Sequence, residues 1–140
     1  MTLRTTACIV PTMLYQNAPK AIEWLRDAFG FEEHLVVPGD DSTVAHAQLR
    51  LGNSMIMLGS SRPDDGSTMM KGPREVGANT HSIYVVIEDI AAHYEQAKDA
   101  GAEIVQELED QDYGGQLYSC YDCEGHLWNF GSYDPWKEIV

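Results

Sequence analysis

Three polar side chains alternate along one predicted strand in a pattern that suits ligand binding. The strand covers residues 43–51, and His46, Gln48 and Arg50 fall on one of its faces because side chains alternate along a strand. Together an imidazole, an amide and a guanidinium can orient a polar ligand, and the guanidinium can hold a carboxylate through two hydrogen bonds. The opposite face carries Ala45, Ala47, Leu49 and Leu51. We interpret the polar face as a binding surface, with the solvated face of an antiparallel sheet as the alternative.

His81 is the second candidate, because it starts another predicted strand at residues 81–88. An imidazole titrates near neutral pH, so it can anchor a ligand or transfer a proton. The alternative is a hydrogen-bonded histidine at a strand end. Cys120 and Cys123 have the C-x-x-C spacing, but they fall at a strand end and a turn, whereas a redox pair uses a helix N-terminus to lower its pKa. We therefore interpret both cysteines as structural.

The chain repeats itself at an interval of about 72 residues. Residues 26–32 correspond loosely to 98–103, and residues 52–60 correspond to 125–132. Each copy reads as a strand, a helix that ends at glycine, and three further strands, which indicates two packed modules. The predicted organisation is a single domain over residues 1–140, with module one at 7–60, a linker at 61–80 and module two at 81–135.

Both predicted helices carry clear start and stop signals. In module one, Asn17 is a suitable N-cap, Pro19 fits the first helical turn and Gly30 ends the helix. In module two, Asp89 and Gly101 have the same roles. Alternation and turn signals predict strands at residues 7–14, 33–38, 43–51, 54–59, 81–88, 103–108, 116–121 and 126–132. The pattern is βαβββ twice, and the fold class is α+β.

The repeat also predicts which side chains share the concavity between the modules. It pairs Met57 with Asn129 and places Tyr118 opposite His46, so all four are expected to line that concavity. Packing in a cross-strand aromatic pair is the alternative for Tyr118. Pro11 marks the first strand as an edge strand or a bulge, because proline cannot donate to a ladder.

Two segments resemble those of a known family. Residues 112–115 followed by 122–131 resemble the closing hairpin of the vicinal oxygen chelate superfamily, which includes glyoxalase I, bleomycin-resistance proteins and extradiol dioxygenases. Cys123 stands where that hairpin usually has proline. Residues 21–31 resemble the family's helix-to-strand segment. The resemblance covers nearly the whole chain and implies an α+β fold in which two βαβββ modules form a cup-shaped mixed sheet with the helices outside.

The resemblance also implies where a metal ion would bind. Metal-dependent members hold one divalent cation on side chains from the first, fourth, fifth and eighth strands, and these positions fall here on Pro11, Met57, His81 and Asn129. Proline offers no donor atom, a thioether is a poor ligand for hard or borderline cations, and a neutral amide is weak. A catalytic ion usually has at least three protein ligands. We therefore expect neither a metal nor another cofactor.

Composition narrows the choice of partners and compartment. A net charge of −13 with nine Lys and Arg argues against binding to nucleic acid or to an anionic membrane surface. No apolar run approaches the roughly 18 residues of a membrane span, and the first residues lack the apolar core of a signal peptide. Three cysteines, an odd number, suit a reducing compartment. We expect a cytoplasmic protein.

The leading interpretation is a homodimeric, glyoxalase- or bleomycin-resistance-like protein that binds a small organic molecule in the cup without a catalytic metal. The expected ligand-binding residues are His46, Gln48, Arg50, Met57, His81, Tyr118 and Asn129. The alternative is a diverged metal-dependent lyase, isomerase or dioxygenase of the glyoxalase superfamily that uses His81. A regulatory module that uses the cup as a sensor is a third reading. Whether the cup lies within one chain or is shared across a dimer stays open at this level.

Overall fold

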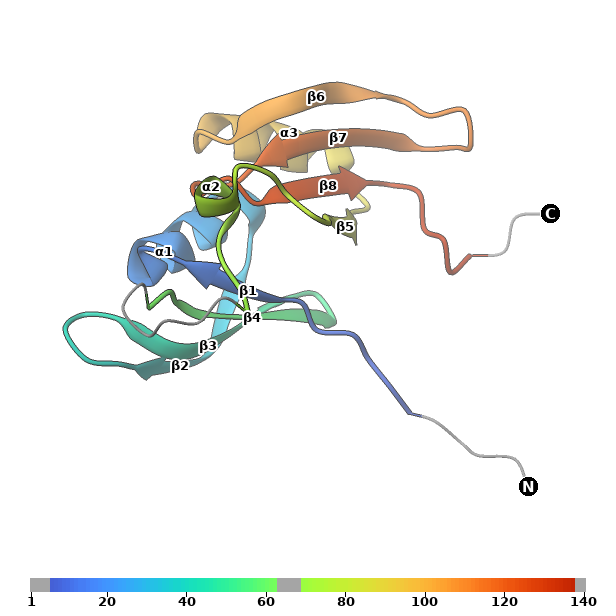
Figure 1. Cartoon of the computed structure of the whole chain (residues 1–140). Helices are drawn as coiled ribbons and strands as arrows, with labels where there is room; N and C mark the ends of the chain where they lie inside the picture. The colour runs from blue at the N-terminus through green and yellow to red at the C-terminus, as the bar shows by residue number, and fades with distance from the viewer. Residues whose placement is uncertain (1–5, 63–68, 138–140) are drawn as a thin grey trace.

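The computed structural model describes residues 6–62 and 69–137, which fold into eight strands and three helices arranged as two similar halves (Figure 1). The first half comprises β1 (Thr12–Tyr15), α1 (Ala18–Phe29), β2 (Glu32–Pro38), β3 (Val44–Leu51) and β4 (Ser54–Ser60). The second half comprises β5 (Ile83–Val86), α3 (Ile90–Asp99), β6 (Glu103–Asp110), β7 (Gln116–Tyr121) and β8 (Leu127–Gly131). A short helix, α2 (Pro73–Val76), lies between the halves. Among the described residues, no helix is both long and apolar enough to cross a membrane.

Each half forms one four-stranded mixed sheet, and the two sheets have equivalent strand orders. These orders are β1-β4-β3-β2 and β5-β8-β7-β6. In each sheet the edge strand, β1 or β5, runs parallel to its neighbour, and the other pairs are antiparallel. The predicted α+β fold of two βαβββ modules is therefore confirmed. β1 is an edge strand, as Pro11 indicated, and the Pro11 carbonyl still accepts a hydrogen bond from the Met57 N–H at 2.9 Å.

The helix signals of the sequence are confirmed in the structure. The Asn17 side chain accepts a hydrogen bond from the Lys20 N–H at 3.3 Å, and Gly30 adopts the left-handed conformation with φ 89°. The Asp89 side chain caps α3 in the same way, through the Ala92 N–H at 3.3 Å. The apolar side of α1 is buried through Ala18, Ala21, Ile22, Leu25, Ala28 and Phe29.

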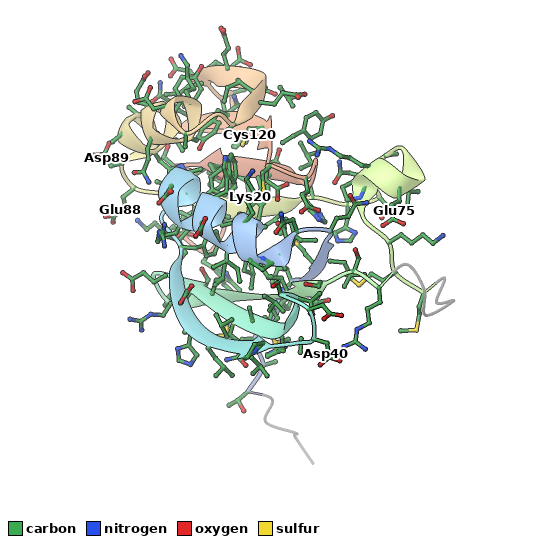
Figure 2. All side chains as sticks on the ribbon, turned by 90° about the vertical axis from the view of Figure 1, so that its left-hand side faces the viewer. Lys20, Asp40, Glu75, Glu88, Asp89 and Cys120 are labelled. Carbon is green, nitrogen blue, oxygen red and sulfur yellow. The ribbon has the colours of Figure 1, made fainter. Side chains whose placement is uncertain are left out.

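One hydrophobic core joins the two halves. α1 packs against the first sheet, α3 packs against the second, and the two helices pack against each other (Figures 1 and 2). The Phe29 ring, at the end of α1, has its centroid 5.1 Å from that of Trp128 and 4.7 Å from that of Phe130. Trp128 and Phe130 are fully buried, as predicted. Each helix therefore covers one face of its own sheet and leaves the opposite face uncovered.

The predicted linker contains a short helix that the sequence does not predict. Pro73 sits in the first turn of α2, and Gly77 ends the helix in the left-handed conformation with φ 88°. Asn79 then fixes the chain against the start of β8, because its Nδ2 donates to the Gly125 carbonyl at 2.9 Å and its Oδ1 accepts from the Leu127 N–H at 3.0 Å. Residues 63–68 of the predicted linker lie outside the described residues.

Two strands begin two or more residues later than the sequence predicts. β1 begins at Thr12, directly after Pro11, and β5 begins at Ile83. Proline has no N–H for a ladder, which accounts for the late start of β1. The late start of β5 leaves His81 two residues before the strand.

Candidate functional site

His46, Gln48 and Met57 lie on the uncovered face of the first sheet. Ala47 and Leu49 are buried in the core, so the residues that alternate with them on β3 face the other way. The His46 Nε2 and Gln48 Oε1 atoms are 2.9 Å apart, within hydrogen-bonding distance. Met57 lies opposite Gln48 in the register of β3 and β4. His46 and Met57 also line a small cavity of about 210 Å³. These three residues therefore share one face of the first sheet.

Arg50 lies at the solvent-exposed end of the same face. Its Nη2 is 3.3 Å from the Glu32 carboxylate, and both side chains are more than half exposed. Because solvent screens such an exposed ion pair, it contributes about 1 kcal/mol or less to the stability of the fold. Two apolar side chains on β2, Leu35 and Val37, lie in register with the polar residues of β3 and are 45% and 40% exposed. The face is thus a mixture of polar groups and unburied aliphatic surface.

Asn129 lies on β8 with its amide fully engaged by neighbouring groups. Its Oδ1 accepts a hydrogen bond from the Ser119 hydroxyl at 2.7 Å. Its Nδ2 donates to the Ser82 hydroxyl at 2.9 Å and to the Ile83 carbonyl at 3.2 Å. The amide therefore positions Ser82, the residue next to His81, and has little capacity left for a ligand of its own.

Tyr118 does not line the uncovered face, and its predicted placement is wrong. The side chain is fully buried on the helix-covered side of β7. Its hydroxyl lies 2.7 Å from the His93 Nδ1 atom of α3, and its ring stacks on Phe130 with centroids 5.3 Å apart. Tyr118 is therefore a core residue at the junction of the sheet and α3.

A one-residue difference in register explains this error. The hairpin of β3 and β4 has a two-residue turn, at 52–53. In the hairpin of β7 and β8, the Asp122 N–H donates to the His126 carbonyl at 2.9 Å, which leaves three residues in the turn. Gln48 pairs with Met57, so an interval of 72 residues would pair Cys120 with Asn129, but Ser119 pairs with Asn129 instead. A slip of one residue moves every side chain of a strand to the opposite face, so one repeat interval cannot describe both strands.

His81 stands at the junction of two larger cavities. It is exposed, and its Nδ1 lies 3.5 Å from the Thr80 hydroxyl oxygen. The larger cavity, of about 840 Å³, and the smaller one, of about 530 Å³, share Pro11, His81, Ser82 and Ile83 as lining residues. His81 can therefore contact a molecule in either cavity.

The larger cavity is mainly apolar. It opens between the N-terminal segment before β1, the start of β4 and the length of β5. Its apolar lining includes Ile9, Met55, Ile56, Val85, Val86 and Trp136. Its volume falls within the range typical of small-molecule sites, about 300–1,000 Å³. The sequence does not predict this cavity, because its wall combines residues that are far apart in the chain.

The smaller cavity is bounded by the connection between the halves. Lys71, Pro73 and Val76 of that segment form one wall, and His126 contributes to the opposite side. The His126 Nε2 lies 3.0 Å from the Leu14 carbonyl oxygen, so this nitrogen carries the proton that is donated. The sequence predicts a simple connection over residues 61–80 and not a cavity wall. The signal that could have indicated order there is the Pro73–Gly77 spacing, which suits a helical turn.

The four positions implied for a metal ion do not fit one. Pro11 offers no donor, Met57 lines a different cavity from His81, and the Asn129 amide is held by three other groups. Within residues 6–62 and 69–137, no group of three or more His, Cys, Asp or Glu side chains is placed to hold a metal ion. A thioether, an amide and one imidazole, set apart from each other, do not make a coordination sphere for a divalent cation.

The cysteine pair also lacks the features of a reactive site. Cys120 is buried in the core, and burial, together with the nearby Asp122 carboxylate, raises its pKa to about 12. Burial and neighbouring carboxylates likewise raise the pKa of Cys123 to about 12. Thiols with such pKa values stay protonated at neutral pH and are poor nucleophiles. The interpretation of both residues as structural agrees with these surroundings.

Known proteins resemble this chain over most of its length. A family model described as Glyoxalase/Bleomycin resistance protein/Dioxygenase superfamily matches residues 9–130. An uncharacterized protein of Mycobacterium bovis is 30% identical over 139 residues, which make up 99% of this chain and 90% of that protein. The crystal structure of TioX from Micromonospora sp. ML1 is 29% identical, with a TM-score of 0.72 over 90% of this chain and 98% of TioX.

More distant structures share the fold. The fosfomycin resistance protein FosX from Mesorhizobium loti is 12% identical, with a TM-score of 0.64 over 94% of this chain and 96% of FosX. A glyoxalase I mutant from Zea mays is 16% identical, with a TM-score of 0.66 over 87% of this chain and 43% of that protein. Given the match of the family model to residues 9–130 and the two βαβββ modules, this chain belongs to the Glyoxalase/Bleomycin resistance protein/Dioxygenase superfamily.

Proposed function

We propose that this protein is a cytoplasmic binder of a small organic molecule and that it acts without a catalytic metal. The observation that carries the proposal is the meeting of two cavities, of about 840 and 530 Å³, at His81 and Ser82. A mainly apolar cavity with a few polar groups at one end is the usual form of a small-molecule site. The free cysteines Cys8, Cys120 and Cys123 support a reducing compartment.

In this proposal the apolar wall supplies affinity and the polar junction supplies orientation. Aliphatic and indole surface in the larger cavity gains about 25 cal/mol for each Å² of apolar area that a ligand removes from water. His81 and Ser82 then orient the polar end of the ligand, with Asn129 positioning Ser82. We propose that a second surface contacts either the ligand or the partner subunit of a dimer. This surface consists of His46, Gln48, Arg50 and Met57.

The donor set favours a binder over a metal-dependent lyase, isomerase or dioxygenase. Family membership alone leaves both open. A metal-dependent reaction needs a cation with several protein ligands and an open position, and the positions implied for one do not supply these ligands. Within the described part of the chain, the His81 ring lies beside the Thr80 hydroxyl, 3.5 Å from its Nδ1, rather than beside a carboxylate that would orient a general base.

We also propose that the protein is a homodimer. Aliphatic and aromatic side chains remain unburied on the uncovered faces of both sheets: Leu35 and Val37 on the first, Tyr84 and Val86 on the second. In a dimer with a twofold axis, a surface of module one in each chain can pack against a surface of module two in the other chain, so the same contact forms twice. The uncovered faces would then become the walls of a closed site.

Substitution of His81 tests the binding proposal. A thermal-shift screen with a library of small aromatic compounds identifies a binding compound, whose affinity is then measured for the wild-type protein and for His81→Ala. We expect His81→Ala to weaken binding about tenfold, because one hydrogen bond to the ligand is lost. His34→Ala is the matched control, because His34 is an exposed histidine on β2. Equal affinities for the wild-type protein and His81→Ala would contradict the proposed site.

Elemental analysis of the untreated protein tests the metal-free proposal separately. We expect less than one-tenth of an equivalent, on the order of background, of Ni, Zn, Fe or Mn, since the family positions lack suitable donors. Stoichiometric metal that is lost in His81→Ala would favour the enzymatic alternative instead.

A further inference from the structure

We propose that the smaller cavity is an anion subsite and that the ligand is an organic monocarboxylic acid. Its carboxylate would lie beside Lys71 and His81, and its apolar body would extend into the larger cavity. This inference rests on the proposed function and adds the chemical class of the ligand.

The charge of the cavity wall differs sharply from that of the whole chain. The protein has 22 Asp and Glu against nine Lys and Arg. The described residues that line the smaller cavity nevertheless include Lys71, His81 and His126, and none of them is an aspartate or glutamate. A strongly acidic protein repels anions over most of its surface. A wall that has no carboxylates and includes a lysine repels an anion less than its surroundings do. Within the described residues, the lining of this cavity therefore favours a negative ligand group.

Hydrogen-bond donors accompany the ammonium group. Thr12, Thr80 and Ser82 line the cavity with hydroxyl groups. The Ser82 oxygen accepts a hydrogen bond from the Asn129 Nδ2 at 2.9 Å, which leaves its own proton to be donated elsewhere. A carboxylate accepts hydrogen bonds and donates none, so a wall of an ammonium group and hydroxyl donors matches it better than it matches a neutral amide.

The number of cations and the shape of the site point to an amphipathic monoanion. Among the described lining residues, Lys71 is the one side chain whose charge is permanent at neutral pH. One such charge balances a carboxylate better than a dianionic phosphate. The two cavities meet at His81 and Ser82, and the larger cavity continues the site with apolar walls. A ligand that spans both therefore carries its charge at one end.

The wall that carries the donors is held in place before the ligand arrives. The two hydrogen bonds of Asn79 to the Gly125 carbonyl and the Leu127 N–H, at 2.9 and 3.0 Å, fix the chain immediately before Thr80 and His81. A preformed wall lowers the ordering cost of binding. The subsite therefore requires little rearrangement of the residues that surround it.

Pairs of compounds that share an apolar body and differ only in a carboxylate or carboxamide end group test the proposal. We would compare 2-naphthoate with 2-naphthamide, and indole-3-acetate with indole-3-acetamide, by isothermal titration calorimetry and by ligand-observed NMR. Each acid is expected to bind at least about tenfold more tightly than its amide, because the ammonium group and hydroxyl donors favour the charged form. The amides retain the apolar contacts and so report on the larger cavity.

Variants of Lys71 locate the effect. Lys71→Gln is expected to weaken binding of the acids about five- to tenfold and to leave the amides unchanged, whereas Lys71→Arg keeps most of the affinity. Lys98→Gln is the matched control. It removes the same charge from the chain, but Lys98 lies on α3 with its Nζ 5.0 Å from the Tyr94 ring centroid. Any effect of net charge alone would appear equally in both glutamine variants.

The outcomes separate this inference from the proposed function. Equal binding of acids and amides would overturn the anion subsite and leave the binding function standing. Equal losses in Lys71→Gln and Lys98→Gln would overturn the assignment to Lys71. If neither member of either pair bound, and the wider library gave no binding compound, the proposed function would be overturned together with the subsite.

Discussion

His93 is a half-buried histidine whose hydrogen bonds suit the neutral form. It lies on α3, where its Nε2 is 3.0 Å from the Phe29 carbonyl and its Nδ1 is 2.7 Å from the Tyr118 hydroxyl. A neutral ring with the proton on Nε2 donates to the carbonyl and accepts from the hydroxyl. Burial lowers the pKa of His93, and the hydrogen bond to the Phe29 carbonyl opposes this only in part. The residue therefore links the two helices as an uncharged group.

This lowered pKa predicts a loss of stability in mild acid. The unfolded chain takes up the His93 proton near pH 6.5, before the folded protein does, so its stabilising effect is complete above that pH and falls as the pH is lowered. The loss is less than about 1.4 kcal/mol per pH unit, and smaller still because the ring keeps some contact with solvent. Urea denaturation at pH 7.5 and 5.5 measures it. His93→Gln should show a smaller difference between the two pH values than wild type or His34→Gln, and an unchanged difference would refute this account.

At the scale of elements, the turn between β7 and β8 fastens the second half of the chain to the first. The buried Asp122 carboxylate accepts hydrogen bonds from the Tyr15 hydroxyl at 2.6 Å and from the Trp128 indole at 3.0 Å. It also accepts from two backbone N–H groups of its own turn, those of Glu124 and His126. Burial and then the Asp122 charge hold the pKa of Tyr15 well above its usual range, so the phenol stays a donor.

Removal of this carboxylate should destabilise the protein strongly. Asp122→Ala leaves several buried donors without an acceptor, and we expect a loss of about 3–5 kcal/mol in the free energy of unfolding. Tyr15→Phe removes one hydrogen bond to a charged group and should cost about 1.5–3 kcal/mol. Asp112→Ala, in the exposed loop before β7, is the control and should change little. Urea denaturation measures the free energy of unfolding of each variant. If Asp122→Ala lost no more of it than the control, this role of Asp122 would be refuted.

Capping residues and hydrophobic periodicity predicted the helices and strands well, because these elements depend on residues that are close together in the chain. Asn17, Gly30 and Asp89 cap their helices as their residue types indicated.

The predicted face of Tyr118 was wrong because the register of its hairpin depends on one additional turn residue, which hydrophobic periodicity does not reveal. The larger cavity was missed for a different reason: its walls come from distant parts of the chain that only packing brings together. Of the seven expected binding residues, the structure places His46, Gln48 and Met57 on one surface and His81 at a separate junction.

At the scale of the whole molecule, the uncovered sheet faces predict self-association. Light scattering after size-exclusion chromatography should give twice the 15.6 kDa mass of one chain. Leu35→Asp combined with Val37→Asp places two charges on an apolar face and should shift the protein to monomer, because a charge buried in an interface is costly. Val76→Asp changes a comparably exposed residue on α2 and should leave the mass unchanged. A monomer at every concentration in the wild type would refute the dimer.

The contact between α1 and α3 has a consequence for the origin of this fold. A gene that encoded one half alone would produce a polypeptide with an exposed apolar side on its helix. In the present chain, the other helix covers that side. Such a primitive protein would have stayed in solution by joining a sister polypeptide through that side. Duplication and fusion would then have turned an encounter that depended on concentration into a permanent one.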